Sequence, residues 1–399
     1  MAKTSLVLFL VLSSFFIALL QCDARTHRSR TQPRPLRPQP EPQRCKYDGI
    51  FQFGDSISDT GNQILEPAGP RSPCAHNPYG QKLIGEPTGR CSNGRLMIDF
   101  IAQALGLPTP KPYLELGLPT PNPYLEPGEP AVSFNHGVNF AVAGSTALNT
   151  SVLLQNGILS PVTNSSLLVQ LDWFLAHYQN LCETAKNCET YNILKGSLFM
   201  VGETGGNDYN YAFLQGKSIE DATALVPLVV NNIRDVAKKL IDLGATRLVV
   251  PGNFPIGCSP MYLTLFKNND STSYDDKGCL KGLNTFARYH NQYLQNALQQ
   301  LRLEYPNVAI VYADYYQAAE WVLTNAPQLG FETKSILKVC CGTGGDYNFS
   351  LMSMCLGWKE FCMFRSDQYI NWDGVHLTEK AYQSMADWLI KSQVFECIV

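Results

Sequence analysis

Ser56 lies in the segment FQFGDSISDTGN (residues 51–62), where an apolar run gives way to small polar residues. A serine at this place could act as a nucleophile, or it could cap the helix that follows, which is a common role for Ser. A free hydroxyl is a weak nucleophile and needs an adjacent base, itself oriented by a third group. Ser56 alone decides nothing, and the groups that would activate it must lie elsewhere in the chain.

His376 is the histidine best placed to be that base. It lies in NWDGVHLTEKAY (371–382), three residues after Asp373 and just before the start of a helix. A tight turn between the two would bring the carboxylate against the imidazole Nδ1, which fixes the tautomer and stabilises the imidazolium. Because D-x-x-H is a common sequence, capping or a surface role is the alternative interpretation. The other histidines lie in the tail, in helical patterns or in loops without a nearby carboxylate: His27, His76, His136, His177 and His290.

Two glycine-containing segments could supply donors to the oxyanion that forms when a serine attacks an ester. In VGETGGNDYNY (201–211), two glycines permit close backbone approach and Asn207 offers a neutral side-chain donor. In GVNFAVAGSTAL (137–148), Gly144 could present a backbone N–H with no side chain in the way. Each segment taken alone is equally well explained as a structural turn.

The four segments together, in their order along the chain (51–62, 137–148, 201–211 and 371–382), resemble the GDSL esterase/lipase family of plants, which is part of the SGNH hydrolases. Gly54, Asp55 and Ser56 match the first motif, and Ile57 stands where the family name has Leu, a mild apolar change. The resemblance runs from about Tyr47 to the C-terminus. The segments ETGGNDYNYAF and KVCCGTGGDYNF are similar to the subgroup of sinapine esterases and acetylajmalan esterases.

The resemblance implies acyl transfer through a serine ester. It assigns Ser56 as nucleophile, His376 as base and Asp373 as the group that orients the base. It also implies an oxyanion hole formed by the backbone N–H groups of Ser56 and Gly144 and the side chain of Asn207. No G-x-S-x-G string of the α/β-hydrolases occurs. We see no metal-ligand spacing and no phosphate loop, so neither a metal nor a cofactor is expected.

The elements that must position these residues alternate short β-like runs with longer helical patterns, which is typical of βαβ units. Fully apolar strands between helices indicate a parallel sheet covered on both faces. We therefore expect one three-layer α/β/α domain, and the resemblance implies the flavodoxin-like sheet of the SGNH hydrolase fold. Strands are expected at 50–54, 197–202, 247–252 and 308–313, and helices within 225–241, over about 284–304 and from Thr378 to Ile390.

The chain is expected to have three parts. Residues 1–24 carry Lys3 and an apolar run, which is typical of a secretory signal peptide. Residues 25–44 are rich in Arg and Pro and predict an extended tail. The hydrolase domain would then occupy 45–399. Within it, the tandem copies LGLPTPKPYLE and LGLPTPNPYLE (105–126) indicate a lengthened surface loop rather than a solenoid.

Cysteine usage points to an oxidising compartment. Of 13 cysteines, Cys22 should leave with the signal, and disulfides are the expected state of the others. The pairing cannot be deduced, although Cys182 with Cys188, and Cys355 with Cys362, are candidate local pairs. Export would also allow glycosylation at four N-x-S sequons, which begin at Asn149, Asn164, Asn269 and Asn348.

Composition excludes some functions. The formal net charge of −3 gives no general attraction to nucleic acid or anionic membranes. No stable membrane insertion is expected, because nothing after the signal approaches the roughly 20 apolar residues of a membrane span. Composition does not predict the oligomeric state. We expect export to the cell wall or apoplast, or delivery to the vacuole through the secretory pathway.

The leading hypothesis is a secreted serine carboxylesterase that hydrolyses small esters. The subgroup resemblance implies acyl or acetyl esters of plant specialised metabolism. One alternative is an acyltransferase of the same type, which passes the acyl group to an alcohol instead of water. Another is a catalytically idle cell-wall or defence protein that kept the fold.

Overall fold

The computed structural model describes residues 46–116, 136–184, 190–351, 355 and 360–396. The expected signal peptide, the Arg- and Pro-rich tail and nearly all of the second tandem copy lie outside these residues. So does Cys188, and with it the candidate pair that it would form with Cys182.

Six parallel strands form one sheet in the order β2-β3-β1-β4-β5-β6. The central pair, β1 and β4, aligns Phe51 with Phe199. The sheet confirms the expected α/β fold, and the ends of the four predicted strands differ from the observed ends by at most one residue. The strands are β1 (Ile50–Phe53), β2 (Lys111–Pro112), β3 (Val138–Asn139), β4 (Leu198–Val201), β5 (Arg247–Pro251) and β6 (Ala309–Ala313).

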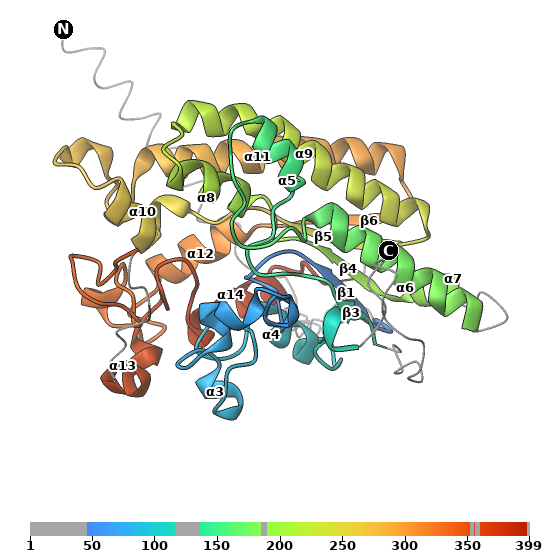
Figure 1. The fold of residues 1–399 in the computed structure, drawn as a ribbon, viewed down its shortest axis with the longest axis horizontal. Helices are drawn as coiled ribbons and strands as arrows, with labels where there is room; N and C mark the ends of the chain where they lie inside the picture. The colour runs from blue at the N-terminus through green and yellow to red at the C-terminus, as the bar shows by residue number, and fades with distance from the viewer. Residues whose placement is uncertain (1–45, 117–135, 185–189, 352–354, 356–359, 397–399) are drawn as a thin grey trace, which may run out of the picture. The chain divides into compact units, whose positions relative to one another are not determined.

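The sheet has a hydrophobic core on each face, because successive side chains of a strand point to opposite sides. Phe51 and Phe53 of β1 pack in one core, whereas Ile50 packs in the other. The first core is covered by α9 (Ile219–Asp242) and α11 (Lys281–Glu304), and the second by α4 (Met97–Ala104) and α14 (Glu379–Lys391). In Figure 1 these helix pairs lie on the two sides of the sheet, as a three-layer architecture requires.

Helix starts follow ordinary capping rules. Helix α9 begins earlier than its apolar periodicity suggests, because Ser218 and Asp221 form a capping box. Thr378 caps α14 as predicted, accepting from the N–H of Ala381. Within the described residues, we find no helix that combines the length and the apolar character needed to cross a membrane. The remaining helices are α2 (Asn62–Leu65), α3 (Gln81–Ile84), α5 (Thr150–Gln155), α6 (Leu167–Thr184), α7 (Thr190–Gly196), α8 (Gly206–Leu214), α10 (Pro260–Leu265), α12 (Tyr315–Thr324) and α13 (Glu360–Arg365).

The first tandem copy contributes to the core, so the prediction of a surface loop is wrong for it. Lys111–Pro112 forms the edge strand β2. Tyr113 is buried, and its ring stacks on Trp173 with the centroids 5.3 Å apart. Pro is tolerated on an edge strand because its missing N–H faces away from the sheet, and the adjacent aromatic ring supplies the apolar contact.

The suggested Cys355–Cys362 pair is also wrong. Cys340 pairs with Cys362 and Cys341 with Cys355. The N–H groups of the two adjacent cysteines bond to backbone oxygens of residues 371–372. These bonds hold both cysteines beside residues 371–372, and from there the two side chains reach different partners, Cys362 in α13 and Cys355. Two further disulfides join Cys74 to Cys91 and Cys258 to Cys279.

Candidate active site

Ser56 lies in the turn after β1, at the carboxyl end of the sheet. Gly54, which precedes it, has a φ of +146°, and a Cβ there would lie 2.8 Å from the carbonyl oxygen of Glu203. Only glycine fits this close approach without a backbone shift. Asp55 then accepts a hydrogen bond from the N–H of Ile57 at 3.0 Å, which tightens the turn. The turn holds Ser56 at the wall of a pocket.

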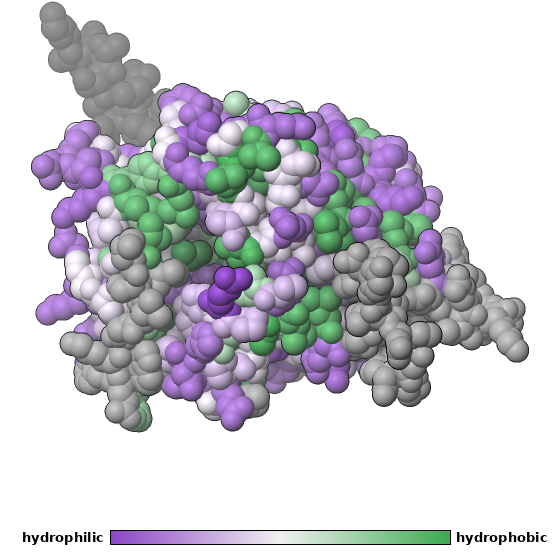
Figure 2. Space-filling view, in the orientation of Figure 1, coloured by the Kyte–Doolittle hydropathy of each residue, from purple (hydrophilic) through white to green (hydrophobic). Residues whose placement is uncertain are grey.

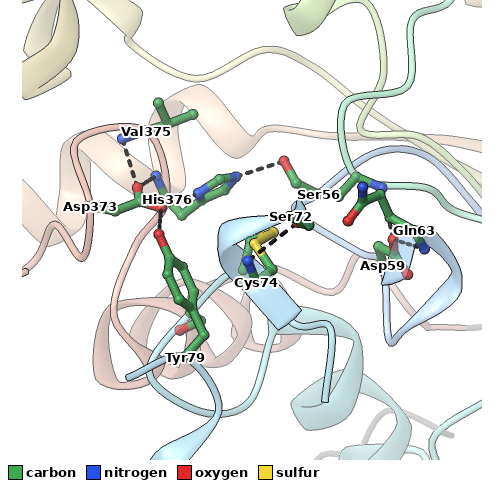
Figure 3. The surroundings of a disulfide bond; sticks show 12 residues. Ser56, Asp59, Gln63, Ser72, Cys74, Tyr79, Asp373, Val375 and His376 are labelled. Atoms are coloured by element: carbon green, nitrogen blue, oxygen red, sulfur yellow. Dashed lines mark hydrogen bonds and ion pairs between the residues drawn. A yellow bond between two sulfur atoms is a disulfide. The ribbon is translucent and has the colours of Figure 1, made fainter. Parts of the chain in front are cut away.

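The structure brings His376 and Asp373 to Ser56, across 320 positions of sequence. The His376 Nε2 lies 2.8 Å from the Ser56 Oγ, and its Nδ1 lies 2.6 Å from the Asp373 Oδ2 (Figure 3). The other oxygen of Asp373 accepts the N–H groups of Val375 at 3.0 Å and of His376 at 2.8 Å. The expected tight turn is therefore present, and the imidazole lies between carboxylate and hydroxyl.

Electrostatics fix the protonation of this pair. Burial alone would raise the pKa of Asp373, but the His376 charge and hydrogen bonds outweigh it and hold that pKa below its ordinary value. Burial alone would lower the pKa of His376, but Asp373 outweighs it and raises that pKa. An ionised carboxylate can only accept, so the Nδ1 of His376 carries a proton, and in the neutral imidazole the Nε2 faces the Ser56 hydroxyl as acceptor.

Tyr79 is a member of this group that the sequence did not reveal. Its hydroxyl donates to the Asp373 Oδ2 at 2.9 Å, the same oxygen that His376 contacts. The phenol is 1% exposed and packs edge-on against Trp372. Burial, with the Asp373 charge beside it, raises the pKa of Tyr79 well above its ordinary value, so it stays a donor. Nothing in the surrounding NPYG segment distinguishes this tyrosine from a core residue.

Gly144 faces the same pocket. Its φ of +83° is left-handed, and a Cβ would lie 2.4 Å from a Val162 methyl, so only glycine is accommodated. The Tyr211 hydroxyl donates to the Gly144 carbonyl oxygen at 2.7 Å and holds this peptide in place. In the part of the chain that the structure describes, the backbone N–H groups of Ser56 and Gly144 have no protein acceptor. Both predicted backbone donors are thus available to a ligand.

Asn207, near the start of α8, reaches the pocket but its amide is already engaged. The Nδ2 donates to the Asp55 Oδ2 at 3.1 Å and to the Ser145 carbonyl at 2.9 Å, which uses both of its hydrogens. The Oδ1 accepts from Asn210 at 3.2 Å. Donation to an oxyanion therefore requires Asn207 to share or give up one of these hydrogen bonds, which the sequence could not indicate.

Two buried carboxyl groups tie the motif segments together. Asp59 accepts three N–H groups that follow it in the chain and also the N–H of Ala143, next to Gly144, at 2.8 Å. Asp208 accepts the N–H groups of Ala147 and Leu148 at 2.8 and 3.0 Å. Burial raises the pKa of Asp59 to about 6 and that of Asp208 to about 7. Sequence reasoning gave neither carboxyl group a role, although Asp208 directly follows Asn207.

Ser56, Gly144, Asn207 and His376 line one pocket of about 230 Å³. In Figure 2, hydrophobic residues reach the surface around a hollow on the face shown. Among the described residues, no group of three or more His, Cys, Asp or Glu side chains is arranged to hold a metal ion.

The four sequon asparagines differ in their surroundings. Asn164 and Asn269 are exposed. Asn149 is half-buried at the start of α5. Asn348 donates from its Nδ2 to the Val339 carbonyl at 2.9 Å, so a glycan on that nitrogen would have to disturb a turn.

Comparison with known proteins defines the class of this enzyme. The model of the GDSL-like lipase/acylhydrolase family matches residues 50–389. The chain is 43% identical to acetylajmalan esterase 1 of Rauvolfia serpentina over 353 residues, which is 88% of each chain. It is 44% identical to a GDSL esterase/lipase of Arabidopsis thaliana, over 90% of this chain and 93% of the relative. With sinapine esterase of Brassica napus it shares 43% identity, over 88% and 87% of the two chains.

The chain belongs to the GDSL-like lipase/acylhydrolase family. It is a carboxylic ester hydrolase of the plant GDSL esterase type, as the predicted resemblance indicated. Its three-layer α/β/α fold with a parallel sheet agrees with this membership.

Proposed function

We propose that the protein is a secreted serine carboxylesterase that cleaves small esters through an acyl-enzyme, with Ser56, His376 and Asp373 as its catalytic triad. One observation carries the proposal: the His376 Nε2 lies 2.8 Å from the Ser56 Oγ, with Asp373 bound to the opposite ring nitrogen. A hydroxyl, a base and a carboxylate in this order form the arrangement that activates a serine.

The proposed reaction has two halves. The His376 Nε2 takes the Ser56 proton as the Oγ bonds to the ester carbonyl carbon, and the N–H groups of Ser56 and Gly144 and the Asn207 amide stabilise the resulting oxyanion. His376 then gives this proton to the leaving alcohol, and the acyl group remains on Ser56. In the second half, His376 deprotonates a water that attacks the acyl-enzyme, and the carboxylic acid leaves as Ser56 regains its proton.

Secretion is supported by chemistry of the mature domain as well as by the signal-like segment 1–24. Four disulfides join described cysteines, and disulfides persist mainly in oxidising compartments. We therefore place residues 1–24 as a cleaved signal, 25–44 as a tail and 45–399 as the secreted domain. Asn164 and Asn269 are the sequons best exposed for glycans. The relatives named for acetylajmalan and sinapine support an acyl or acetyl ester of specialised metabolism as substrate.

The test compares wild-type protein with Ser56→Ala on p-nitrophenyl acetate. Loss of the nucleophile should reduce kcat by about 10⁴-fold or more, and a fluorophosphonate probe should label Ser56 of the wild type only. Equal rates in the two proteins, or labelling of another residue, would show that Ser56 is not the nucleophile.

A product analysis tests hydrolysis against acyl transfer. The wild-type enzyme is given an acetyl ester in water together with an excess of a candidate acceptor alcohol, and free acetate and the new ester are quantified. Free acetate should dominate. If the new ester dominates instead, the hydrolase assignment is wrong and the alternative acyltransferase is correct.

A further inference from the structure

Three large apolar side chains remain exposed at the wall of the Ser56 pocket. Val162, Leu214 and Leu351 are 40%, 41% and 44% exposed. They come from three separate segments. Val162 lies in the loop between α5 and α6, Leu214 is the last residue of α8, and Leu351 lies in a turn between α12 and α13. Scattered exposed leucines are ordinary, but apolar side chains that converge on one hollow indicate a ligand-binding groove.

The loop that carries Val162 is held on both sides by hydrogen bonds. The Thr163 hydroxyl donates to the Glu66 carboxylate at 2.9 Å. On the other side, the Gln215 amide accepts from the Leu159 N–H at 2.9 Å and donates to the Leu159 carbonyl at 2.8 Å. Gln215 directly follows Leu214, so this pair also fixes the spacing between the Val162 loop and the end of α8. These hydrogen bonds fix the position of the loop and keep Val162 exposed.

The pocket offers little to a charged ligand. Its described lining contains no Lys, Arg or Glu, and its one acid is Asp373. Four donors already occupy Asp373: the Tyr79 hydroxyl, the His376 ring and two backbone N–H groups. Apart from His376, the other polar lining groups are neutral. Moving a charge from water into such surroundings is costly, because no opposite charge compensates for its lost hydration.

We infer that Val162, Leu214 and Leu351, the apolar rim, bind a compact hydrophobic group of a neutral ester, and that the enzyme discriminates against esters that carry a charge at this place. This inference rests on the proposed function of Ser56 and adds the substrate class. The pocket volume of about 230 Å³ is below the roughly 300–1,000 Å³ of drug-sized ligand sites, so the group is small.

The test uses pairs of esters that differ in charge but hardly in shape. On the alcohol side, 3,3-dimethylbutyl acetate is compared with acetylcholine, in which N⁺ replaces a quaternary carbon. On the acyl side, p-nitrophenyl 4-methylpentanoate is compared with p-nitrophenyl hemisuccinate. The side of the ester that contacts the rim should show at least about a tenfold higher kcat/KM for the neutral member. A ratio near one in both pairs, or preference for the charged member, would overturn the inference.

Variants of the rim sharpen the test. Leu214→Asp places a carboxylate beside the hollow. Where the rim contacts the alcohol side, the alcohol-side ratio should move toward acetylcholine, a gain that misfolding cannot produce; where it contacts the acyl side, the preference for the 4-methylpentanoate over the hemisuccinate should increase. Val162→Thr keeps the shape and should raise KM for the neutral ester. Leu303→Asn is the matched control, because Leu303 is 78% exposed on α11 and does not line the pocket. An unchanged ratio in Leu214→Asp together with an unchanged KM in Val162→Thr would contradict a role for the rim.

The same assays separate the two proposals. Ser56-dependent cleavage of p-nitrophenyl acetate without charge discrimination would leave the catalytic proposal standing and remove the apolar rim. Cleavage that persists in Ser56→Ala would remove the catalytic proposal itself.

Discussion

The two halves of the candidate site differ in how complete they are. On the side of the base, each carboxylate oxygen of Asp373 accepts two hydrogen bonds, and His376 already contacts the Ser56 hydroxyl. On the side of the proposed oxyanion, Gly144 lines the pocket and its N–H has no acceptor among the described residues, whereas the Asn207 amide donates to Asp55 and to a carbonyl.

The difference shows which part of the site has to rearrange. The proposed proton transfer from Ser56 needs no movement of Asp373 or His376, because both contacts are in place. In the proposed oxyanion hole, Asn207 must exchange a hydrogen bond to Asp55 or Ser145 for one to the oxyanion. Since such an exchange is favourable only when negative charge develops, Asn207 should act on the transition state rather than on ground-state binding.

The largest expected effect comes from the side of the base. Asp373→Asn should lower kcat by about 10⁴-fold, because an amide in place of the carboxylate favours the wrong imidazole tautomer. Steady-state kinetics on p-nitrophenyl acetate measure this loss. Asp346→Asn, which changes an exposed aspartate paired with Lys267, should retain wild-type rates. A loss of less than tenfold in Asp373→Asn would show that His376 does not depend on this carboxylate.

A smaller effect is expected on the side of the oxyanion. Asn207→Ala should lower kcat by about 10²–10³-fold with little change in KM, since the lost donor acts mainly on the oxyanion. The control is Asn156→Ala, an exposed asparagine whose amide donates to the Val152 carbonyl within its own helix. If KM rose and kcat stayed constant, Asn207 would be a ground-state binding residue instead.

The smallest effect should come from Tyr79→Phe, which removes one donor from Asp373. The carboxylate then interacts more strongly with protonated His376, so the raised pKa of His376 rises further. The proposed base works in its neutral form, so kcat/KM falls at low pH as His376 becomes protonated. This acidic limb of the pH profile should move to higher pH in Tyr79→Phe. A hydrogen bond worth about 0.5–1.5 kcal/mol corresponds to a shift of roughly 0.4–1 unit.

The pH profile distinguishes this effect from general damage. In Tyr79→Phe, kcat/KM at high pH should return to the wild-type value. The control is Tyr289→Phe on an exposed face of α11, which should leave the acidic limb where it is in the wild type. A limb that stayed in place or moved to lower pH would contradict the assigned role of Tyr79.

Much of the fold was predictable because it rests on local patterns. The apolar run before Ser56 predicted β1, and the helical repeat that ends before Gly244 predicted α9. His376 was selectable because Asp373 lies three residues away in sequence. Where the role of a residue depends on neighbours within one turn of the chain, a single sequence is enough to predict it.

The features that escaped prediction depend on contacts between distant segments. Tyr79 resembles any core aromatic until the fold places its hydroxyl against Asp373, 294 positions away. The acceptors that occupy Asn207 lie 152 and 62 positions away. Tyr113 was assigned to a surface loop because its segment is rich in proline, and proline content does not predict that one aromatic ring will be buried. Cys340 and Cys341 are adjacent, so sequence distance could not separate their partners.

The adjacent cysteines have a consequence for making the enzyme. Their N–H groups pair with the backbone of residues 371–372, directly before Asp373, and their side chains are bridged to Cys362 and Cys355. Two neighbouring thiols can easily exchange partners during oxidation, since thiolates attack nearby disulfides. We therefore expect the residues beside Asp373 to take their place only when the correct disulfides have formed, and recombinant enzyme should be produced where a disulfide isomerase is present.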